Sequence, residues 1–488
     1  MCRDAINRVP TNHPQARRTG IYEMRTAMKQ FTRRPSTWKR RVYGIVLCCL
    51  MLLLSGCVSL FAGTSGTTTR TSSPPLTVTD LTPVANPSPT PLSDSQLAAA
   101  LVKSMSLDDK LGQMVIVEFY GSTLNADLLH MIQISRIGGV LIENKNGNAV
   151  SRQQLVSLNQ SMQAQARIPL FISTDYEGGL VNELVRITGP RPSEATIGAA
   201  RDPNVAYNAG LNAAKDLTSL GLNVNFMPIV DVLTNPNNPG LPDRTFGSDP
   251  QLVTQMGQAY LKGLTAGGVI GSLKHFPGLG SATIDPHLSL PTMNRSLATL
   301  NAVDFVPYTT MINEGIVPMV MVTHILNPQL DPTLPTSLSP KVVTGILRDQ
   351  LHFNGVIISD TLWMGGISNT YSLSQAAILA VKAGIDLILG PRGLQDTVTM
   401  LASMKQAVTS GQLSINAINA SVQRIIEMKL HYKLLTHNQA QQLIDNSAAL
   451  RSDQGRGISP SLARNSASNT NIQAIQVIRD ADVRRQGA

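Results

Sequence analysis

The chain has 488 residues, enough for one large α/β barrel with tails or for more than one average domain, and 42% of them are hydrophobic, which allows a sizeable core. Its net charge of +9 lies wholly in residues 1–56, where eleven Lys and Arg face two acidic residues, and the rest of the chain is balanced at 29 of each sign. The charge therefore gives no support for nucleic-acid binding by the folded part.

Residues 1–57 are typical of an export leader. Lys39, Arg40 and Arg41 precede a thirteen-residue apolar run, 42–54, which is shorter than the roughly 20 residues of a membrane span. Residues 54–57 end in Cys57 and resemble a bacterial lipobox, whose cysteine is lipidated. An uncleaved anchor over about 42–63 is the alternative. The lipidated cysteine and the uncleaved anchor both predict a domain outside the cell, anchored to the outer face of the cytoplasmic membrane.

The remaining cysteines, Cys2, Cys48 and Cys49, precede the lipobox, so disulfides and cysteine-based metal sites are excluded from the exported domain. Residues 58–95 are rich in Ser, Thr and Pro and are expected to form an extended linker. Residues 436–488 lose the apolar periodicity and predict helix remnants followed by disorder, with a weak final helix near 472–483.

Between these segments, residues 96–435 alternate short apolar runs with amphipathic stretches. Eight continuous apolar runs indicate parallel strands buried on both faces, and eight β-then-α units favour a single (β/α)8 TIM-type barrel over the alternative of a doubly wound open sheet. The expected strands are 114–119, 138–142, 169–174, 223–229, 269–275, 318–323, 355–359 and 386–389, and the expected helices include 204–220, 249–266, 339–351 and 374–383.

Polar residues gather where these strands end. Asp175 follows the third strand, Arg244 lies after the fourth, and the fifth, sixth and seventh end at Lys274-His275, His324 and Asp360. In a barrel such positions meet at one rim, where catalytic groups are found. A single residue of this kind would more often be a satisfied core group or a helix cap, but five consecutive strands indicate a site.

The loop after the fifth strand carries Asp285-Pro286-His287. The i, i+2 spacing in an extended loop places both side chains on one side, so Asp285 can accept a hydrogen bond from one ring nitrogen of His287 and raise the basicity of the other. Such a histidine can donate and then abstract a proton. For an isolated Asp-x-His a surface turn is the alternative.

The segments KHFPGLGSATIDPHLSLP at 274–291 and GVIISDTLWMGGI at 355–367 resemble the signatures of family 3 glycoside hydrolases, specifically the single-domain bacterial β-N-acetylglucosaminidases. The resemblance runs from about 107 to 435. It implies a barrel in which Asp360 is the nucleophile and His287, paired with Asp285, is the general acid/base. It further implies that Asp175, Arg244, Lys274 and His275 bind sugar hydroxyls and that His324 lines the same wall.

The chain departs from the family pattern at four positions: Leu279 replaces a common His, Pro286 a small hydroxyl residue, Tyr176 a Gln and Glu183 an Arg. Pro286 is expected to stiffen its loop, and Tyr176 and Glu183 are expected to affect the shape of the substrate subsites more than the chemical step. We therefore expect a monomeric, retaining exo-β-N-acetylglucosaminidase without metal or cofactor, acting on terminal GlcNAc of muropeptides or chito-oligosaccharides. The alternatives are another family 3 β-glycosidase such as a β-glucosidase, a Schiff-base lyase using Lys274, and a non-catalytic glycan-binding lipoprotein.

Overall fold

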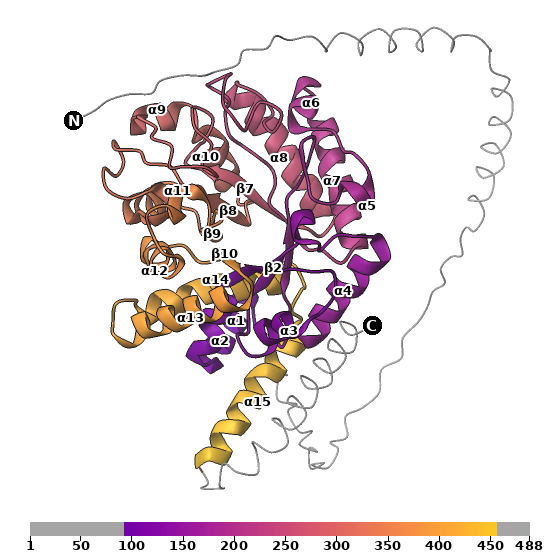
Figure 1. Ribbon diagram of the computed structural model, residues 1–488, viewed down its shortest axis with the longest axis vertical. Helices are drawn as coiled ribbons and strands as arrows, with labels where there is room; N and C mark the ends of the chain where they lie inside the picture. Colours follow the sequence, from indigo (N-terminus) through magenta and orange to yellow (C-terminus); the bar gives the residue numbers. More distant parts are fainter. Residues whose placement is uncertain (1–91, 456–488) are drawn as a thin grey trace, which may run out of the picture. The chain divides into compact units, whose positions relative to one another are not determined.

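The computed structural model describes residues 92–455, whose strands form a ring surrounded by helices (Figure 1). In this range eight parallel strands follow the order β10-β1-β2-β3-β6-β7-β8-β9, and a parallel bridge between Ile358 and Leu387 joins the two ends. The expected (β/α)8 barrel is confirmed. The barrel strands are β1 Val115–Glu118, β2 Gly139–Leu141, β3 Phe171–Thr174, β6 Val224–Asn225, β7 Ile270–Phe276, β8 Met319–Val322, β9 Val356–Ser359 and β10 Ile388–Arg392.

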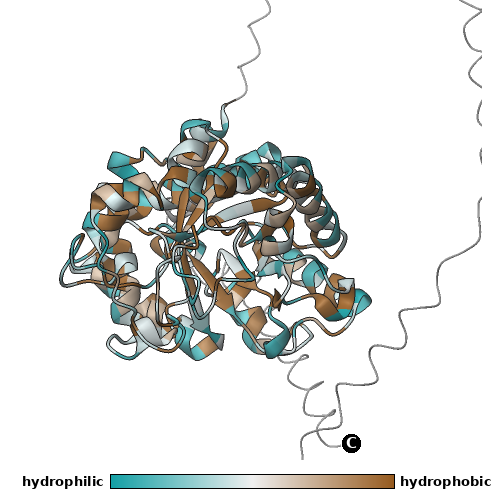
Figure 2. Cartoon of the chain, turned by 90° about the horizontal axis from the view of Figure 1, so that it is seen from above, coloured by the Kyte–Doolittle hydropathy of each residue, from teal (hydrophilic) through white to brown (hydrophobic). Residues whose placement is uncertain are grey.

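The strands are short because the apolar runs that form them are short. Nearly every strand residue is buried, as expected for runs of Val, Ile and Leu that face the barrel interior on one side and the helices on the other. Figure 2 shows these central strands as mainly hydrophobic. The strand expected at 223–229 is reduced to β6, since Pro228 has no N–H for the ladder, and only an isolated bridge between Ile229 and Lys274 continues the pairing.

Helices cover the outside of the barrel and begin at the residues that cap them. Asp202 and Asp249 each accept a backbone N–H, and a proline occupies the first helical position of α7 and of α8. The helices are α1 Asp94–Ser104, α2 Leu107–Gln113, α3 Ala126–Gln133, α4 Arg152–Gln165, α5 Val185–Thr188, α6 Glu194–Ala199, α7 Pro203–Ser219, α8 Pro250–Ala266, α9 Leu297–Ala302, α10 Val306–Asn313, α11 Gly365–Ser368, α12 Leu373–Ala383, α13 Gly393–Thr409, α14 Ile415–His431 and α15 His437–Gly455.

Smaller elements complete the described chain. A hairpin of β4 (Tyr176–Gly178) and β5 (Val181–Asn182) follows β3 at the rim. Two short 3-10 turns, η1 (Asn144–Asn146) and η2 (Thr336–Leu338), lie in loops. The helix expected at 339–351 is η3 (Lys341–Gln350), which has π-helical hydrogen bonding.

The first and last helices of the described chain pack against each other on the outside of the barrel. The part of the tail expected as helix remnants contains α15, which packs against α1 and extends away from the barrel in Figure 1. Helix α1 begins two residues before the expected domain boundary at 96, with Ser93 as its cap. The leader with Cys57, most of the 58–95 linker and the helix expected near 472–483 lie outside the described residues. Within 92–455 no helix is both long and apolar enough to cross a membrane.

Candidate active site

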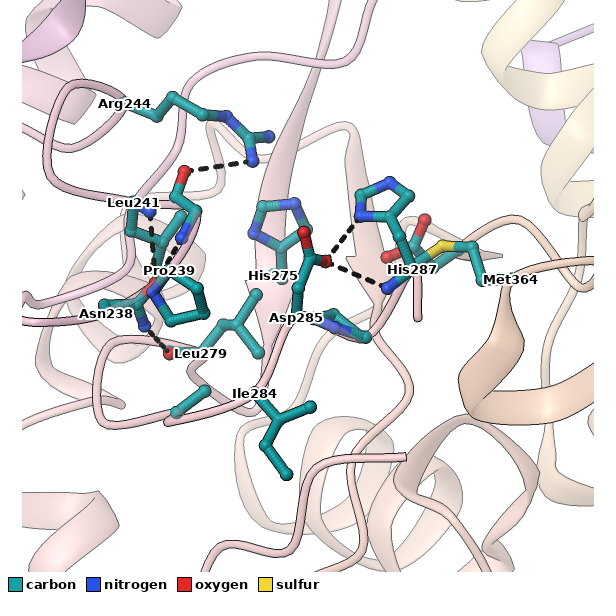
Figure 3. Close-up of a pocket in the computed structure, with 14 residues that line it drawn as sticks. Asn238, Pro239, Leu241, Arg244, His275, Leu279, Ile284, Asp285, His287 and Met364 are labelled. Atoms are coloured by element: carbon teal, nitrogen blue, oxygen red, sulfur yellow. Dashed lines mark hydrogen bonds and ion pairs between the residues drawn. The ribbon is translucent and has the colours of Figure 1, made fainter. Parts of the chain in front are cut away.

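A small cavity lies at the carboxyl end of the barrel, among the polar residues that follow the strands (Figure 3). Five of the eight residues predicted as catalytic or substrate-binding line it, together with loop residues that follow the fourth and fifth barrel strands. The lining residues are Asn238, Pro239, Gly240, Leu241, Arg244, His275, Leu279, Ala282, Ile284, Asp285, Pro286, His287, Asp360 and Met364. The loop after the fifth strand and the end of the seventh strand therefore share one cavity, as the sequence predicts.

Asp360 follows β9 directly and reaches this cavity from a buried position. Its Oδ2 accepts a hydrogen bond from the Thr323 hydroxyl at 2.9 Å, and its Oδ1 accepts one from the Thr361 backbone N–H at 2.8 Å. Burial by itself would raise the pKa of Asp360, but the nearby imidazoles of His324, His275 and His287 and the Thr361 N–H outweigh it and hold the pKa below its ordinary value. The side chain is therefore an ionised carboxylate at neutral pH.

His287 and Asp285 form a hydrogen-bonded pair that lines the same cavity. The Nδ1 of His287 lies 2.7 Å from Oδ1 of Asp285, which also accepts the His287 backbone N–H at 2.9 Å. Burial would raise the pKa of Asp285, but these bonds and the His287 charge lower it below its ordinary value. An ionised Asp285 fixes a proton on Nδ1, which leaves Nε2 as the nitrogen that can exchange a proton with a ligand.

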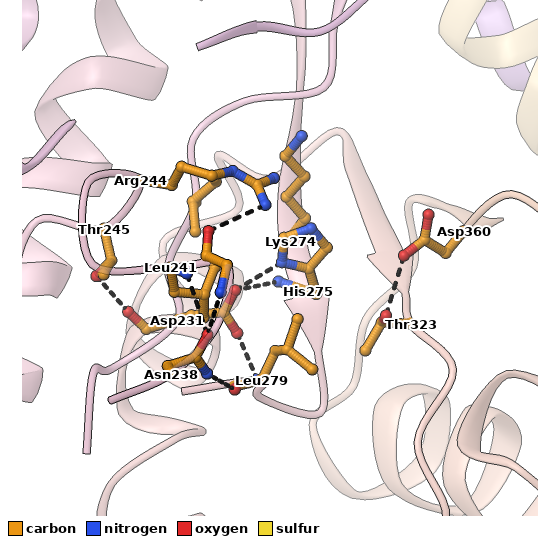
Figure 4. A network of polar contacts seen from close by, with 12 residues as sticks. Asp231, Asn238, Leu241, Arg244, Thr245, Lys274, His275, Leu279, Thr323 and Asp360 are labelled. Carbon is orange, nitrogen blue, oxygen red and sulfur yellow. Dashed lines mark hydrogen bonds and ion pairs between the residues drawn. The ribbon is translucent and has the colours of Figure 1, made fainter. Parts of the chain in front are cut away.

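His275, at the end of β7, is held by a residue outside the predicted set. Asp231 accepts the His275 Nδ1 hydrogen at 2.6 Å through Oδ2 and the Leu279 backbone N–H at 2.6 Å through Oδ1. Figure 4 shows this contact, with the Thr323–Asp360 bond on the other side of the site. Asp231 is fully buried, so it fixes both the imidazole and the start of the loop that carries His287.

A buried network of charges lies beside the cavity. Lys274 Nζ contacts Asp175 Oδ1 and Glu177 Oε1, each at 2.6 Å, and Arg244 binds Glu177 through two bonds of 2.7 and 2.9 Å. Burial would lower the pKa of Lys274, but the two carboxylates raise it above its ordinary value. Burial would raise the pKa of Glu177, but Arg244 and Lys274 lower it to about 2. The network thus holds a charged ammonium, which is the wrong protonation state for the nucleophilic amine of a Schiff-base lyase.

His324 occupies a different position from the other predicted residues. Its Nδ1 accepts a hydrogen bond from the Ser337 hydroxyl at 2.7 Å, and its Nε2 donates to the Thr361 carbonyl at 3.1 Å. Burial lowers the pKa of His324 below its ordinary value, although the nearby Asp360 carboxylate opposes the shift. Both nitrogens are used within the protein, and the histidine supports the backbone next to Asp360 instead of lining the cavity.

Sequence reasoning missed three residues that hold the site together: Glu177, Asp231 and Thr323. Asp231 and Glu177 each follow a strand by a few residues, the same signal that pointed to Asp175 and Asp360. Their roles depend on partners 44 to 97 residues away in the chain, which spacing alone does not reveal.

The sequence model of the family described as "Glycosyl hydrolase family 3 N terminal domain" matches residues 106–428. The chain belongs to glycosyl hydrolase family 3. The resemblance expected from the two motifs is therefore confirmed, and with it the expectation of a glycoside hydrolase.

Family 3 relatives resemble the chain over the whole barrel. It is 32% identical over 386 residues to "Beta-hexosaminidase LpqI" of Mycobacterium tuberculosis, covering 78% of this chain and 96% of LpqI. It is 32% identical to "Beta-hexosaminidase A" of Pseudoalteromonas piscicida over 63% of this chain but only 56% of that longer protein. A solved family 3 β-N-acetylglucosaminidase from Paenibacillus has 32% identity and a TM-score of 0.65, with 70% of this chain and 68% of that one covered.

Proposed function

We propose that the protein is a retaining exo-β-N-acetylglucosaminidase that removes terminal β-linked GlcNAc from muropeptides or chito-oligosaccharides. The observation that carries the proposal is that Asp360 and the Asp285–His287 pair line one cavity from two separate loops. A carboxylate and a proton donor on either side of a glycosidic bond are what a retaining mechanism requires. The beta-hexosaminidase names of the relatives support GlcNAc as the sugar.

In the first step an oxygen of Asp360 attacks the anomeric carbon while the bond from that carbon to the leaving oxygen breaks. His287 transfers its Nε2 proton to the leaving oxygen, and a glycosyl ester to Asp360 remains. In the second step the neutral His287 accepts a proton from water, the water oxygen bonds to the anomeric carbon, and the ester breaks. Two inversions restore the original configuration and regenerate both side chains.

The substrate-binding residues are assigned roles that fit their positions. Asp175 is about a quarter exposed and can accept hydrogen bonds from sugar hydroxyls, while Lys274 stays buried behind it. Arg244 and His275 line the cavity and can donate to vicinal hydroxyls.

We also propose export with an anchor at Cys57. A relative in Arthroderma benhamiae, described as a secreted glycosyl hydrolase, supports export. The anchor is tested with the Cys57→Ser variant: if this variant stays in the membrane fraction, the lipid anchor is contradicted.

Substrate choice is tested with paired aryl glycosides. We expect kcat/KM for an aryl β-GlcNAc to exceed that for the matching aryl β-glucoside by about 100-fold, since a site built to bond a polar substituent rejects an analogue that lacks it. Equal rates on both glycosides would favour the β-glucosidase alternative. The His287→Ala variant, measured alongside, should lose activity on both.

The nucleophile is tested by trapping. Incubation with a fluorosugar that forms a slowly hydrolysed glycosyl-enzyme should add one sugar mass to the peptide that contains Asp360, measured by mass spectrometry. The Asp360→Asn variant should give no adduct and should retain a folded circular dichroism spectrum. An adduct on another residue, or borohydride trapping of substrate on Lys274, would overturn the mechanism.

A further inference from the structure

Both ends of the loop that carries His287 are hydrogen-bonded to neighbouring loops, but its middle has few contacts of its own. This acid/base loop (residues 277–295) leaves the His287 side chain 57% exposed, and the apolar side chains of Ile284 and Leu288 are 44% and 75% exposed. Within the middle of the loop, the Leu288 and Ser289 backbone N–H groups bond only to the Asp285 carbonyl. Such an exposed segment takes up one position only if another element fixes it.

That element is the start of α11, five residues after Asp360. The Gly365 backbone N–H donates to the His287 carbonyl at 3.0 Å, and the Gly366 N–H donates to the Pro286 carbonyl at 3.0 Å. A third bond runs from Asn369 Nδ2 to the Leu288 carbonyl at 3.3 Å. Three consecutive carbonyls around the histidine are therefore held by one short segment.

The close approach requires the absence of side chains. A Cβ on Gly365 would lie 2.3 Å from the Leu288 carbonyl oxygen and 3.0 Å from that of His287. A Cβ on Gly366 would lie 3.2 Å from the Pro286 carbonyl oxygen and 3.3 Å from His324 Cβ. Since the groups in the way are mostly backbone, a side chain at Gly365 forces the loop to move, which explains glycine there.

We propose that Gly365 and Gly366 are positioning residues for catalysis, whose N–H groups fix the acid/base loop so that His287 faces Asp360. The inference rests on the proposed function and adds to it how the two catalytic groups are kept in register. One covalent stretch, from Asp360 to Gly366, carries the nucleophile at one end and the contact to the His287 backbone at the other. A displacement of about 1 Å in such a pair is enough to cost on the order of 100-fold in rate.

The test compares Gly365→Ala with a matched glycine. Gly345→Ala on η3 is the control, because a Cβ there has its nearest neighbour at 3.8 Å and the position is exposed. Two aryl β-GlcNAc substrates are used: phenyl, whose leaving oxygen needs protonation, and dinitrophenyl, whose leaving oxygen does not. His287→Ala gives the reference behaviour for loss of the acid/base, and sodium azide is added to each variant as an external nucleophile that needs no general base.

We expect Gly365→Ala to lower kcat/KM for the phenyl substrate by about 100-fold and for the dinitrophenyl substrate by less than about tenfold. Azide should raise its turnover of the dinitrophenyl substrate and yield the β-glycosyl azide, as for His287→Ala. Gly345→Ala should behave as wild type. An equal loss on both substrates without azide rescue would overturn the proposal, because a general loss of structure does not depend on the leaving group.

Asn369→Ala covers the case in which Gly365→Ala fails to fold. This exposed substitution removes one of the three bonds without adding atoms, so we expect the same leaving-group dependence, reduced to roughly threefold to tenfold. Wild-type kinetics in a folded Asn369→Ala, with Gly365→Ala unfolded, would count against the proposal. If His287→Ala itself shows neither leaving-group dependence nor azide rescue, the proposed function fails first, and the positioning role fails with it.

Discussion

Glu177 lies between the two cations of the substrate-binding region, and its carboxylate is fully buried. Both of its oxygens bond Arg244, and one of them also bonds Lys274, which Asp175 holds as well. A buried ion pair is weak evidence for net stability, but removing one partner leaves uncompensated charge and is costly. Glu177 is therefore the one side chain that contacts both cations of this network.

We predict that Glu177→Gln lowers kcat/KM by about 100-fold and destabilises the fold by about 3–5 kcal/mol, because the Lys274–Arg244 repulsion is then poorly balanced. The pH dependence gives a second test. The pKa of Glu177 is about 2 in the folded protein, against an ordinary value of 4.5. Its stabilisation is thus complete above pH 4.5 and is lost as the pH falls toward 2.

Urea unfolding of wild type and Glu177→Gln between pH 2 and pH 5 should therefore show a steeper loss of stability for wild type. Glu183→Gln is the matched control, since Glu183 is only partly buried at the same rim and bonds the Asn144 N–H instead of a cation. Identical slopes for wild type and Glu177→Gln would contradict the prediction.

At the scale of elements, α14 packs beneath the barrel and inserts Lys429 among the strand starts. The fully buried Nζ of Lys429 donates to the Gln113 side chain at 2.9 Å and to the Gly138 carbonyl at 3.0 Å, and it lies 4.6 Å from the centre of the Phe171 ring. No carboxylate accompanies these contacts, and burial lowers the pKa of Lys429 to about 7. The helix is thus attached to the barrel through an amine that is largely neutral in mildly alkaline solution.

This attachment predicts a second rise of stability with pH, in the same direction as that of Glu177 but in an alkaline window. Between pH 7 and the ordinary lysine pKa of 10.5 the unfolded chain binds a proton that the folded chain has released, so stability rises with pH across this window, by up to about 1.4 kcal/mol per unit. Lys429→Met should remove that rise. Thermal unfolding from pH 7 to pH 10 checks it, with the exposed Lys382→Met as control, and an unchanged slope in Lys429→Met would refute it.

At the scale of the whole molecule, the closure of the barrel depends on a charged residue beside the last strand. Asp386, fully buried, accepts the Ile357 backbone N–H at 2.9 Å and the Ser421 hydroxyl at 2.7 Å, and it forms ion pairs with Arg348 and Arg424. These partners come from η3, β9 and α14. One carboxylate therefore ties the closing strand to two surrounding helices.

We predict that Asp386→Ala lowers the free energy of unfolding by about 3–5 kcal/mol, because two guanidinium groups and a strand N–H lose their partner. Asp349→Ala, on the exposed side of η3, should change it by less than about 0.5 kcal/mol. Equilibrium urea denaturation measures both. Similar stability for the two variants would mean that closure rests on the apolar strands alone.

The sequence predicts the barrel well because each strand is a short apolar run with local boundaries. It also points to Asp360, His287 and Asp285 as residues of one cavity, because each stands just after a strand or within a recognisable loop motif. It cannot predict how His324 is used, since Ser337 and the Thr361 carbonyl satisfy that histidine only once the chain is folded. The bonds of Gly365 and Gly366 to the acid/base loop cannot be predicted from the sequence either. They join backbone groups, so the only sign of them in the sequence is a pair of glycines.

The place where α1 joins the barrel has a consequence for how the enzyme meets its substrate. Asp94 and Ser95 lie beside Pro318 and Gly355, at the starts of β8 and β9, whereas Asp360 lies past the end of β9. Ser93 and the start of α1 therefore lie at the opposite end of the barrel from the cavity. With the anchor proposed at Cys57, the chain would enter on that side, and the cavity would stay open to the ends of long or branched glycans.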